Sequence, residues 1–328
     1  MSVCYPTVMN IELTTNCPLH CPQCYCTLTG GNNIEREKAI YWIREGSKLG
    51  VKDVMLSGGE TLCYPYLYEI IEAANLYCGH SNVSLSGAYF TQQVFDKLQQ
   101  VKVSRIFISL NGSNEEVNSL SRDGFALSLN ALELLKKNKY RNTIINWVMH
   151  RNNADDFPNM VKIAEKYDVS TIVILGLKPD SNHSLGSIPT KEQMKNVRDI
   201  IRSYKGKVRI MVENCFSPML ALLGETLLFG NLNVGRNNGC GAGYDTFSVN
   251  VDGLLSPCRH LNIYEQFENG NEYWNSSPIL QELRKLREGE AEEPCNKCSY
   301  TDYCKPCFAI TKEVEKRLYK GNPFCPLQ

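Results

Sequence analysis

The chain has 328 residues, of which 43% are hydrophobic, so it can bury a substantial core and does not fit the disordered or fibrous classes. The 35 Lys and Arg residues balance the 35 Asp and Glu residues, and the absence of a basic block argues against a nucleic-acid partner. The amino-terminal segment lacks the features of a signal peptide, and the apolar runs are too short to span a bilayer. We therefore expect a cytoplasmic protein without a membrane partner.

Strands and helices alternate through the first two thirds of the chain. Hydrophobic runs bounded by turn residues predict strands at residues 8–14, 51–59, 82–87, 104–112, 143–150 and 170–176. Apolar residues at helical spacing predict helices at residues 35–50, 65–77, 91–100, 125–138, 154–167 and 191–204. Six strand–helix units in succession predict an α/β fold with a parallel sheet, in the form of a partial (βα)6 barrel.

Fifteen cysteines, far above the usual content, divide the chain into parts. None lies between residues 79 and 214, and eight lie from Cys215 to the carboxyl terminus. In a chain without an export signal, clustered cysteines hold metal or carry out redox chemistry. We predict a barrel over residues 1–205, a bridging strand and helix over residues 206–239, and a small cysteine-rich domain over residues 240–328.

Residues that can carry chemistry follow the predicted strands. Parallel α/β barrels place their active sites at the carboxyl ends of the strands, so these residues are expected to meet at one rim. They are Cys17, Cys21, Cys24, Gly58, Gly59, Glu60, Ser86, Ser109, Asn111 and His150. His150, together with Glu213 further along the chain, is a candidate acid–base group, although a structural role is the more common one for such residues.

The first loop has the spacing C-x3-C-x2-C, which supplies three thiolates from Cys17, Cys21 and Cys24. Most iron–sulfur cubes are held by four cysteines, so three thiolates leave one iron of a [4Fe-4S] cluster without a protein ligand. An open iron can chelate a small molecule through nitrogen and oxygen. The loop therefore predicts a cluster whose open iron binds a co-substrate.

This loop after the first strand, combined with the Gly-Gly-Glu turn after the second, resembles the pattern of radical S-adenosylmethionine (radical SAM) enzymes. The resemblance implies that Cys17, Cys21 and Cys24 hold the catalytic [4Fe-4S] cluster and that its open iron binds the amine and carboxylate of S-adenosylmethionine. It further implies that reduction of the cluster yields a 5'-deoxyadenosyl radical, which is chemistry supplied by the cofactor.

The resemblance also implies which residues contact S-adenosylmethionine. In the family, the turn after the second strand meets the methionyl amine, polar residues near the end of the fourth strand lie close to the ribose, and an arginine can pair with the methionyl carboxylate. The matching residues here are, in that order, Gly58, Gly59 and Glu60, then Ser109 and Asn111, and then Arg122.

The carboxyl-terminal cysteines have the spacing C-x12-G-x4-C, followed by C-x2-C-x5-C-x2-C and a last cysteine, which resembles the SPASM extension of the same family. The resemblance implies two auxiliary [4Fe-4S] clusters, and so three clusters in all. The implied ligands of the outer auxiliary cluster are Cys295, Cys298, Cys304 and Cys325. Those of the inner one are Cys240, Cys258 and Cys307, and its fourth ligand is Cys215, a substrate group or none.

SPASM members mostly modify peptides, often precursors of ribosomal natural products, so the resemblance implies a peptide substrate and a reductant such as flavodoxin or ferredoxin. Arg259 stands where sulfatase-maturing members carry an aspartate, and the fourth inner-cluster cysteine of those members is missing. These two departures make a sulfatase-maturing role the weaker alternative. No separate leader-binding domain fits before the first predicted strand.

Cys215 bears on the choice between two reactions on a peptide. As a hydrogen-atom donor it would serve L-to-D epimerisation, and the compact chain without a leader-binding domain favours this reaction. As a fourth ligand of the inner cluster, or as a small buried apolar residue, it would have no such role. Thioether or carbon–carbon cross-linking is the alternative, because auxiliary clusters can accept the electron of a product radical.

A different class of function stays open beside these. The cysteine array could bind zinc, and the chain would then be a non-catalytic scaffold or a redox-sensing module. The colour of the purified protein separates the two classes, because iron–sulfur proteins are brown and zinc proteins are colourless.

Overall fold

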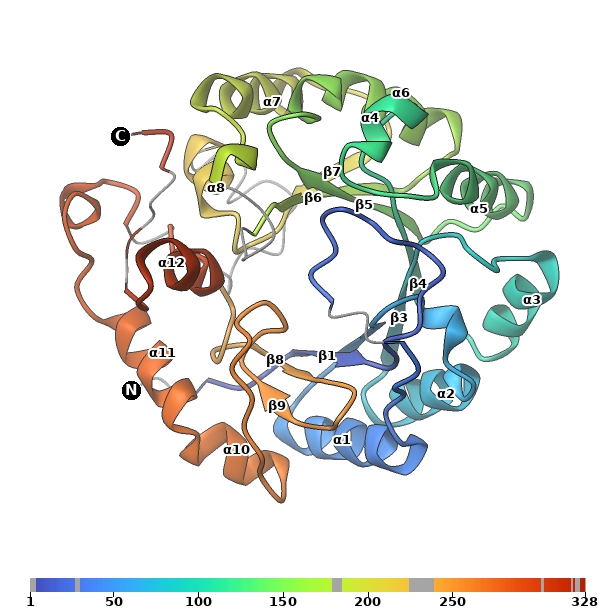
Figure 1. Cartoon of the computed structure of the whole chain (residues 1–328), viewed down its shortest axis with the longest axis horizontal. Coiled ribbons are helices and arrows are strands. Elements are labelled where there is room, and N and C mark those ends of the chain that lie inside the picture. Colours follow the sequence, from blue (N-terminus) through green and yellow to red (C-terminus); the bar gives the residue numbers. More distant parts are fainter. Residues whose placement is uncertain are drawn as a thin grey trace. The chain divides into compact units, whose positions relative to one another are not determined.

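The computed structural model describes residues 4–26, 30–178, 185–223, 239–301, 304–319, 321 and 325–327. The chain forms two compact units. The first unit consists of Met1–Ser109, Arg122–Ile144 and Ala242–Arg284, and the second of Leu110–Ser121, Ile145–Gly241 and Lys285–Gln328. Each unit is built around parallel strands (Figure 1).

The sheet of the first unit has the strand order β4-β3-β2-β1-β8-β9. All neighbouring pairs in it are parallel except β8–β9, which is antiparallel. The strands are β1 (Val8–Glu12), β2 (Asp53–Ser57), β3 (His80–Leu85), β4 (Arg105–Ser109), β8 (Thr246–Val249) and β9 (Leu255–Ser256).

Strand β1 lies between β2 and β8, and its side chains alternate between the two faces of the sheet. Met9 and Ile11 are fully buried on one face, whereas Asn10 and Glu12 are half-buried on the other. The register pairs Glu12 with Ser57, at the end of β2. Because the three strands are parallel, the loops that follow β1, β2 and β8 leave the sheet at the same edge.

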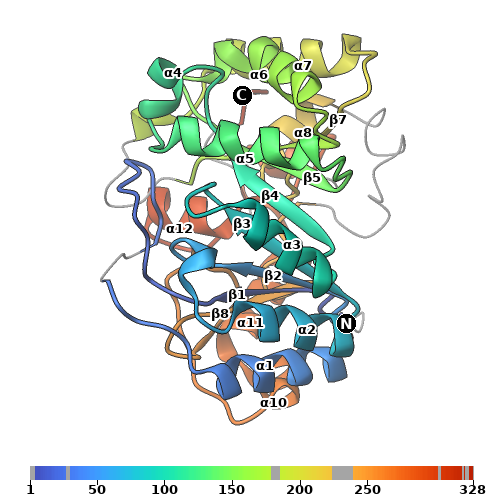
Figure 2. The same ribbon diagram turned by 90° about the vertical axis from the view of Figure 1, so that its right-hand side faces the viewer.

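Helices cover the face of this sheet on which Met9 and Ile11 are buried, because a Cβ atom on Gly46 would lie 2.8 Å from the Met9 sulfur. Figures 1 and 2 show α1 and α2 side by side along the strands, and α1 also packs against α10. Helix α1 ends at Gly50, whose left-handed backbone (φ 105°) suits glycine. The helices of this unit are α1 (Arg36–Leu49), α2 (Leu67–Tyr77), α3 (Gln92–Gln100), α5 (Phe125–Lys137) and α10 (Gly270–Ser276), with the short helix η1 (Thr61–Cys63); α11 (Pro278–Glu288) begins in it.

The second unit contains the strand order β7-β6-β5, with β6 and β7 parallel. Its strands are β5 (Thr143–Met149), of which residues 145–149 lie in this unit, β6 (Thr171–Gly176) and β7 (Arg209–Val212). Its helices are α4 (Glu115–Ser119), α6 (Phe157–Lys166), α7 (Lys191–Ser203), α8 (Ser217–Leu223) and α12 (Phe308–Glu315), with η2 (Ala154–Asp156), η3 (Leu185–Ser187) and η5 (Cys295–Lys297).

The predicted α/β class with a parallel sheet is confirmed. All six predicted strands and all six predicted helices are present, with ends shifted by a few residues. Thr91 caps α3 as the pattern predicts, since its hydroxyl accepts a hydrogen bond from the Val94 amide at 3.3 Å. The predicted domain boundaries stay predictions. Across the described residues, no helix combines the length and the apolar character that crossing a membrane requires.

Candidate functional site

The loop after β1 and the glycine turn after β2 are joined by backbone hydrogen bonds. The Gly59 amide donates to the Thr14 carbonyl at 2.7 Å, and the Glu60 amide donates to the Asn16 carbonyl at 2.8 Å. A Cβ atom on Gly58 would lie 2.4 Å from the Thr14 oxygen, and one on Gly59 would lie 2.3 Å from the Asn16 oxygen. Only glycine fits at these two positions, because the obstacle is backbone rather than a movable side chain.

The three thiols of Cys17, Cys21 and Cys24 gather on this loop. A turn brings the Cys24 amide to the Cys21 carbonyl at 3.0 Å. Burial, together with smaller contributions from the negative charges of Glu60, Cys21 and Cys24, raises the pKa of Cys17 to about 11. Burial also raises the pKa of Cys21. Thiols in such surroundings deprotonate readily only when a metal cation takes the place of the proton.

Arg122 lies beside the cysteine loop. The loop is anchored there because the His20 amide donates to the Asp123 carboxylate at 2.8 Å and Gly124 packs against Leu19. The positive charge of Arg122 opposes the rise in the pKa of both Cys21 and Glu60, which places the guanidinium near both groups. The predicted partner of the methionyl carboxylate is thus close to the predicted cluster ligands and to the predicted partner of the methionyl amine.

Glu60 is buried, with 1% of its surface exposed, and its carboxylate is held in one orientation. It accepts hydrogen bonds from the Ser86 amide at 2.8 Å, from the Ser86 hydroxyl, and from the Leu62 amide at 3.2 Å. Burial raises the pKa of Glu60, and these hydrogen bonds and Arg122 oppose the rise. The sequence predicts Ser86 at the rim, but its role as the support of Glu60 follows only from the structure.

The two predicted ribose contacts lie in different units. The carbonyl of Ser109, at the end of β4, accepts a hydrogen bond from the Ser128 hydroxyl at 3.1 Å. Asn111 belongs to the second unit and is buried, with its side-chain nitrogen donating to Ser121 at 3.0 Å and its side-chain oxygen accepting from the Val148 amide at 3.0 Å. Asn111 therefore has a structural role, and its contact with ribose stays a prediction.

His150 shares this buried network in the second unit. Its Nδ1 accepts a hydrogen bond from the Asn152 amide at 3.2 Å, so in the neutral ring Nε2 carries the proton and faces the Ser121 hydroxyl at 2.9 Å. Burial lowers the pKa of His150 to about 4. The ring is therefore neutral at physiological pH and supports the strand end, in line with the structural role that is the more common one for such a residue.

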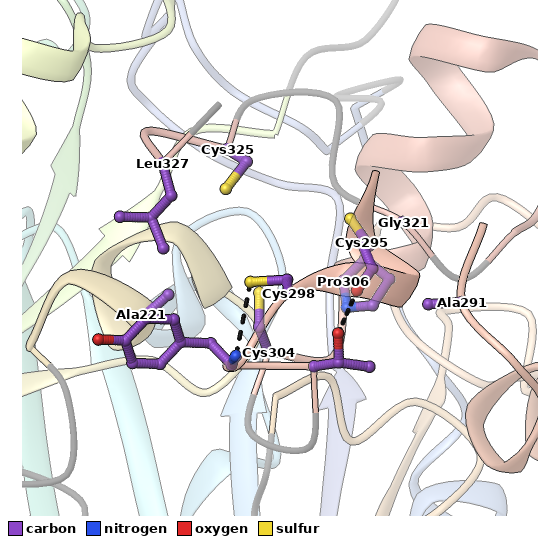
Figure 3. A pocket seen from close by; sticks show the side chains of 11 residues that line it. Ala221, Ala291, Cys295, Cys298, Cys304, Pro306, Gly321, Cys325 and Leu327 are labelled. Atoms are coloured by element: carbon purple, nitrogen blue, oxygen red, sulfur yellow. Dashed lines mark hydrogen bonds between the residues drawn. The ribbon is translucent and has the colours of Figure 1, made fainter. Parts of the chain in front are cut away.

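The predicted ligands of the outer auxiliary cluster surround one small cavity in the second unit. Figure 3 shows Cys295, Cys298, Cys304 and Cys325 around this space, which has a volume of about 20 Å³. The Tyr300 amide donates to the Cys298 sulfur at 3.5 Å, a contact that stabilises a thiolate. Helix α12 begins directly after Cys307.

Three thiols of the second unit form a chain of hydrogen bonds. The Cys215 thiol is bonded to that of Cys307, which is bonded to that of Cys240. The Cys240 amide also donates to the Lys305 carbonyl at 3.3 Å, two residues before Cys307. Cys258, the remaining predicted ligand of the inner cluster, lies in the first unit directly after β9.

Lys178 supplies a positive charge next to these thiols. It forms a buried ion pair with Glu213, whose carboxylate also accepts a hydrogen bond from the Gly176 amide at 2.7 Å. Although burial lowers the pKa of Lys178, the charges of Cys215, Glu213 and Cys307 raise it, and the net shift is upward. A fixed ammonium beside clustered thiols suits an anionic iron–sulfur centre, because it offsets part of the negative charge of the thiolates.

The donor sets suit clusters better than single ions. Among the described residues, no three Cys, His, Asp or Glu side chains converge closely enough to hold one metal ion. A single zinc ion would draw its thiolates to about 2.3 Å from one point, whereas each thiolate of a cubic cluster binds a different iron. That these cysteines hold iron–sulfur clusters stays a prediction.

Comparisons with known proteins bear on the family and the fold. Residues 11–164 match the family model of the radical SAM superfamily. Among solved structures, SuiB of Streptococcus suis bound to its precursor peptide SuiA is 15% identical, with a TM-score of 0.77 over 98% of this chain and 76% of that chain. The structure of anSMEcpe with bound AdoMet is 19% identical, with a TM-score of 0.74 over 96% of this chain and 93% of that chain. At these identities, the likeness shows a shared fold.

Proposed function

Because this chain is a radical SAM protein, with the domain of that superfamily at residues 11–164, we propose that it is an enzyme that modifies a peptide residue by abstracting a hydrogen atom. The observation that carries this proposal is the joined loop and turn of the first unit. It gathers three thiols, two obligatory glycines, Glu60 and Arg122 at one edge of the sheet.

Each of these residues has a proposed task. Cys17, Cys21 and Cys24 hold the catalytic [4Fe-4S] cluster, and Arg122 pairs with the methionyl carboxylate of S-adenosylmethionine. Glu60 accepts from the methionyl amine and keeps its orientation through Ser86. When bound, the cluster and S-adenosylmethionine supply the 5'-deoxyadenosyl radical. The chain's own contribution is to fix the positions of these groups and to exclude water from them.

A peptide substrate is supported by the solved structures with the same fold. SuiB has been solved with its precursor peptide SuiA, and anSMEcpe with the Kp18Cys peptide. Both cover most of the present chain, at 98% in each case. We propose a peptide as the substrate of this protein as well, and flavodoxin or ferredoxin as the source of electrons.

We propose two auxiliary [4Fe-4S] clusters, which gives three clusters in all. The outer one is held by the four cysteines around the cavity of Figure 3, namely Cys295, Cys298, Cys304 and Cys325. The inner one is held by Cys240, Cys258 and Cys307, with Cys215 as its fourth ligand. The support for Cys215 is its thiol hydrogen bond with Cys307 and the presence of Lys178 beside both.

The reaction is either epimerisation or oxidative cross-linking. Epimerisation, favoured by the sequence analysis, needs Cys215 as a free hydrogen-atom donor. The interaction of Cys215 with Cys307 instead favours cross-linking, because a fully ligated inner cluster can accept an electron but cannot donate a hydrogen atom. The product mass decides between them. An unchanged mass with one deuterium gained from D2O indicates epimerisation, and a loss of two hydrogens indicates a cross-link.

Iron and sulfide analysis of the anaerobically purified protein tests the proposal. We expect about twelve irons per chain, falling by about four in the variant Cys17→Ala/Cys21→Ala/Cys24→Ala. We also expect 5'-deoxyadenosine from the wild type after reduction with dithionite, and none from the triple variant. A colourless protein that releases zinc, or a fully loaded protein that forms no 5'-deoxyadenosine, would refute the enzymatic function and leave the scaffold alternative.

A further inference from the structure

A polar cavity of about 280 Å³ lies in the first unit, at the edge where β1, β2 and β8 end. Its volume equals that of about nine water molecules at ~30 Å³ each and approaches the lower limit of small-molecule pockets, ~300 Å³. Tyr25 and Cys26 line it directly after the last cysteine of the catalytic loop, and Arg259 lines it directly after Cys258. A molecule in the cavity would therefore lie between the catalytic loop and a proposed ligand of the inner cluster.

Three charged residues line this cavity, namely Glu12, Asp252 and Arg259, and of these Glu12 and Arg259 have opposite charges. Glu12 enters it as the last residue of β1, and Arg259 enters it from the loop after β9. Among the described residues, no ion pair with a nitrogen–oxygen distance of 4.0 Å or less joins Glu12 to Arg259. A third group that bridges the two is therefore needed if both charges are to be satisfied when water leaves the cavity.

The Arg259 guanidinium is held in place but keeps donors for a ligand. One of its nitrogens donates to the Ser57 hydroxyl at 3.4 Å, which is a long hydrogen bond, and its central carbon lies 5.0 Å from the centre of the Tyr25 ring. A guanidinium has five N–H donors, and this single bond leaves most of them to point elsewhere. Tyr25 and Ser57 thus orient the Arg259 side chain, which lines the cavity. Its remaining N–H groups are available to a ligand there.

Glu12 has the complementary property. No hydrogen bond to its carboxylate is found among the described residues, and burial raises its pKa by more than Arg259 lowers it. A ligand N–H directed at Glu12 would compensate this burial. The cavity therefore calls for a group that presents a donor on one side and an acceptor on the other.

A peptide amide is the group that meets this requirement. It carries one N–H donor and one C=O acceptor on opposite sides. Asn32, Asn250 and Asn262 add further side-chain amides to the cavity wall, which can pair with neighbouring peptide groups. Of the residues proposed to contact S-adenosylmethionine, Gly58 lines this cavity, whereas Glu60, Ser109 and Arg122 do not, so the cavity adjoins the proposed co-substrate site but lacks its charged contacts.

We propose that this cavity binds the main chain of the substrate peptide, with Arg259 donating to a peptide carbonyl and Glu12 accepting from a peptide N–H. The inference rests on the proposed function, which supplies the peptide. It assigns to Arg259, the residue that departs from the sulfatase-maturing pattern, a part in binding the substrate. The bound residue is thereby held next to the catalytic loop, where a hydrogen atom can be taken from it.

A library of peptides tests the proposal, because it samples many sequences in one experiment. The anaerobically loaded protein, saturated with S-adenosylmethionine, is mixed with acetyl-capped decapeptide amides whose central positions are randomised, and the retained peptides are identified by mass spectrometry. We expect the wild type and the control Arg44→Met, a surface arginine on α1, to retain the same subset. Arg259→Met and Glu12→Met should bind that subset at least tenfold more weakly, which corresponds to about 1.4 kcal/mol.

A second measurement separates direct contact from a general loss of structure. One retained peptide is resynthesised with a single N-methyl group at each amide in turn. For the wild type, one position should lose at least tenfold in affinity because its N–H faces Glu12, and in Glu12→Gln the same methylation should cost less because the acceptor is neutral. The iron content of each variant confirms that it has folded.

Two outcomes would overturn the proposal. They are equal retention by the wild type and both cavity variants, and no retention by the wild type. Formation of 5'-deoxyadenosine by the wild type, measured in the same samples, distinguishes a failure of the proposed function from a failure of the cavity assignment. If it fails, the proposed function fails; if it succeeds while the peptide results are negative, only the assignment of this cavity fails.

Discussion

Acidification is expected to destabilise the protein through His150. The neutral ring is buried, at 3% exposure, and its hydrogen-bond partners are Ser121, Asn152 and Asn153, none of which carries a charge. Burial lowers its pKa from 6.5 to about 4. A charged imidazolium would find no counter-ion among these partners, so protonation favours the unfolded chain.

The size of the effect follows from the shift. The difference between 6.5 and about 4 corresponds to about 3 kcal/mol at ~1.4 kcal/mol for each pKa unit. The unfolded chain binds the proton first as the pH falls, so the contribution is complete above pH 6.5 and is lost as the pH falls toward about 4. Between these values, the free energy of unfolding should fall by ~1.4 kcal/mol per pH unit because of this residue alone.

Histidine NMR measures this pKa directly. In protein labelled with ¹³C at the ring Cε1, the His150 resonance should keep the position of the neutral ring between pH 8 and pH 5. The variant His150→Gln assigns the signal by its disappearance. The same variant should show a flatter loss of stability in acid, followed by urea unfolding under anaerobic conditions. A His150 resonance that titrates near pH 6.5 would refute the reasoning, because it would mean that the ring is solvated.

Three further changes test other parts of the structure. Gly59→Ala places a Cβ atom 2.3 Å from a backbone oxygen and should displace the cysteine loop, with loss of about four irons and of 5'-deoxyadenosine formation. Gly79→Ala is the control for backbone strain alone, because its φ of 100° is left-handed but its Cβ atom would meet nothing within 4 Å. Lys178→Met should destabilise the protein by about 1–3 kcal/mol because it leaves the Glu213 carboxylate, which is only 18% exposed, without its partner, and Lys178→Met/Glu213→Gln should recover part of that loss in thermal unfolding. Cys215→Ala should alter the electron paramagnetic resonance spectrum of the reduced inner cluster while leaving the catalytic one unchanged; an unaltered spectrum would remove Cys215 from the ligand set.

The alternation of strands and helices could be read from the sequence because each element is long enough to show its own period. Strand β8 could not be predicted from the sequence, although it pairs with β1 next to the cysteine loop. It has four residues, and its partner β1 lies at the other end of the chain, as the contact between Asn10 and Thr246, 236 positions apart, shows. No local pattern encodes a pairing over that distance, so the place of Arg259 at the end of β1 and β2 required the structure.

In the site, too, the spacing of residues in the sequence predicts some features, whereas others follow only from contacts in the structure. The spacing of Cys295, Cys298, Cys304 and Cys325 predicts a common centre, and the structure places these residues around one cavity. Asn111 also matches a family position, but its amide is used by Ser121 and Val148. Glu12 carries no signal in the sequence, because a single acid at the end of a strand is ordinary. The proposed role of Glu12 follows from the cavity that it lines and from Arg259, which lines the same cavity without forming an ion pair with it.

The pairing of β1 with β8 also has a consequence for the synthesis of the protein. The edge of β1 that receives β8 stays open until Thr246 has left the ribosome, 236 residues after Asn10. At ~5–20 residues per second, the nascent chain spends roughly 10–50 s with this edge unpaired. An open strand edge next to reactive thiols invites wrong pairing with other chains. Production of the protein should therefore depend strongly on chaperones, and truncation before residue 246 should give aggregates rather than a folded barrel.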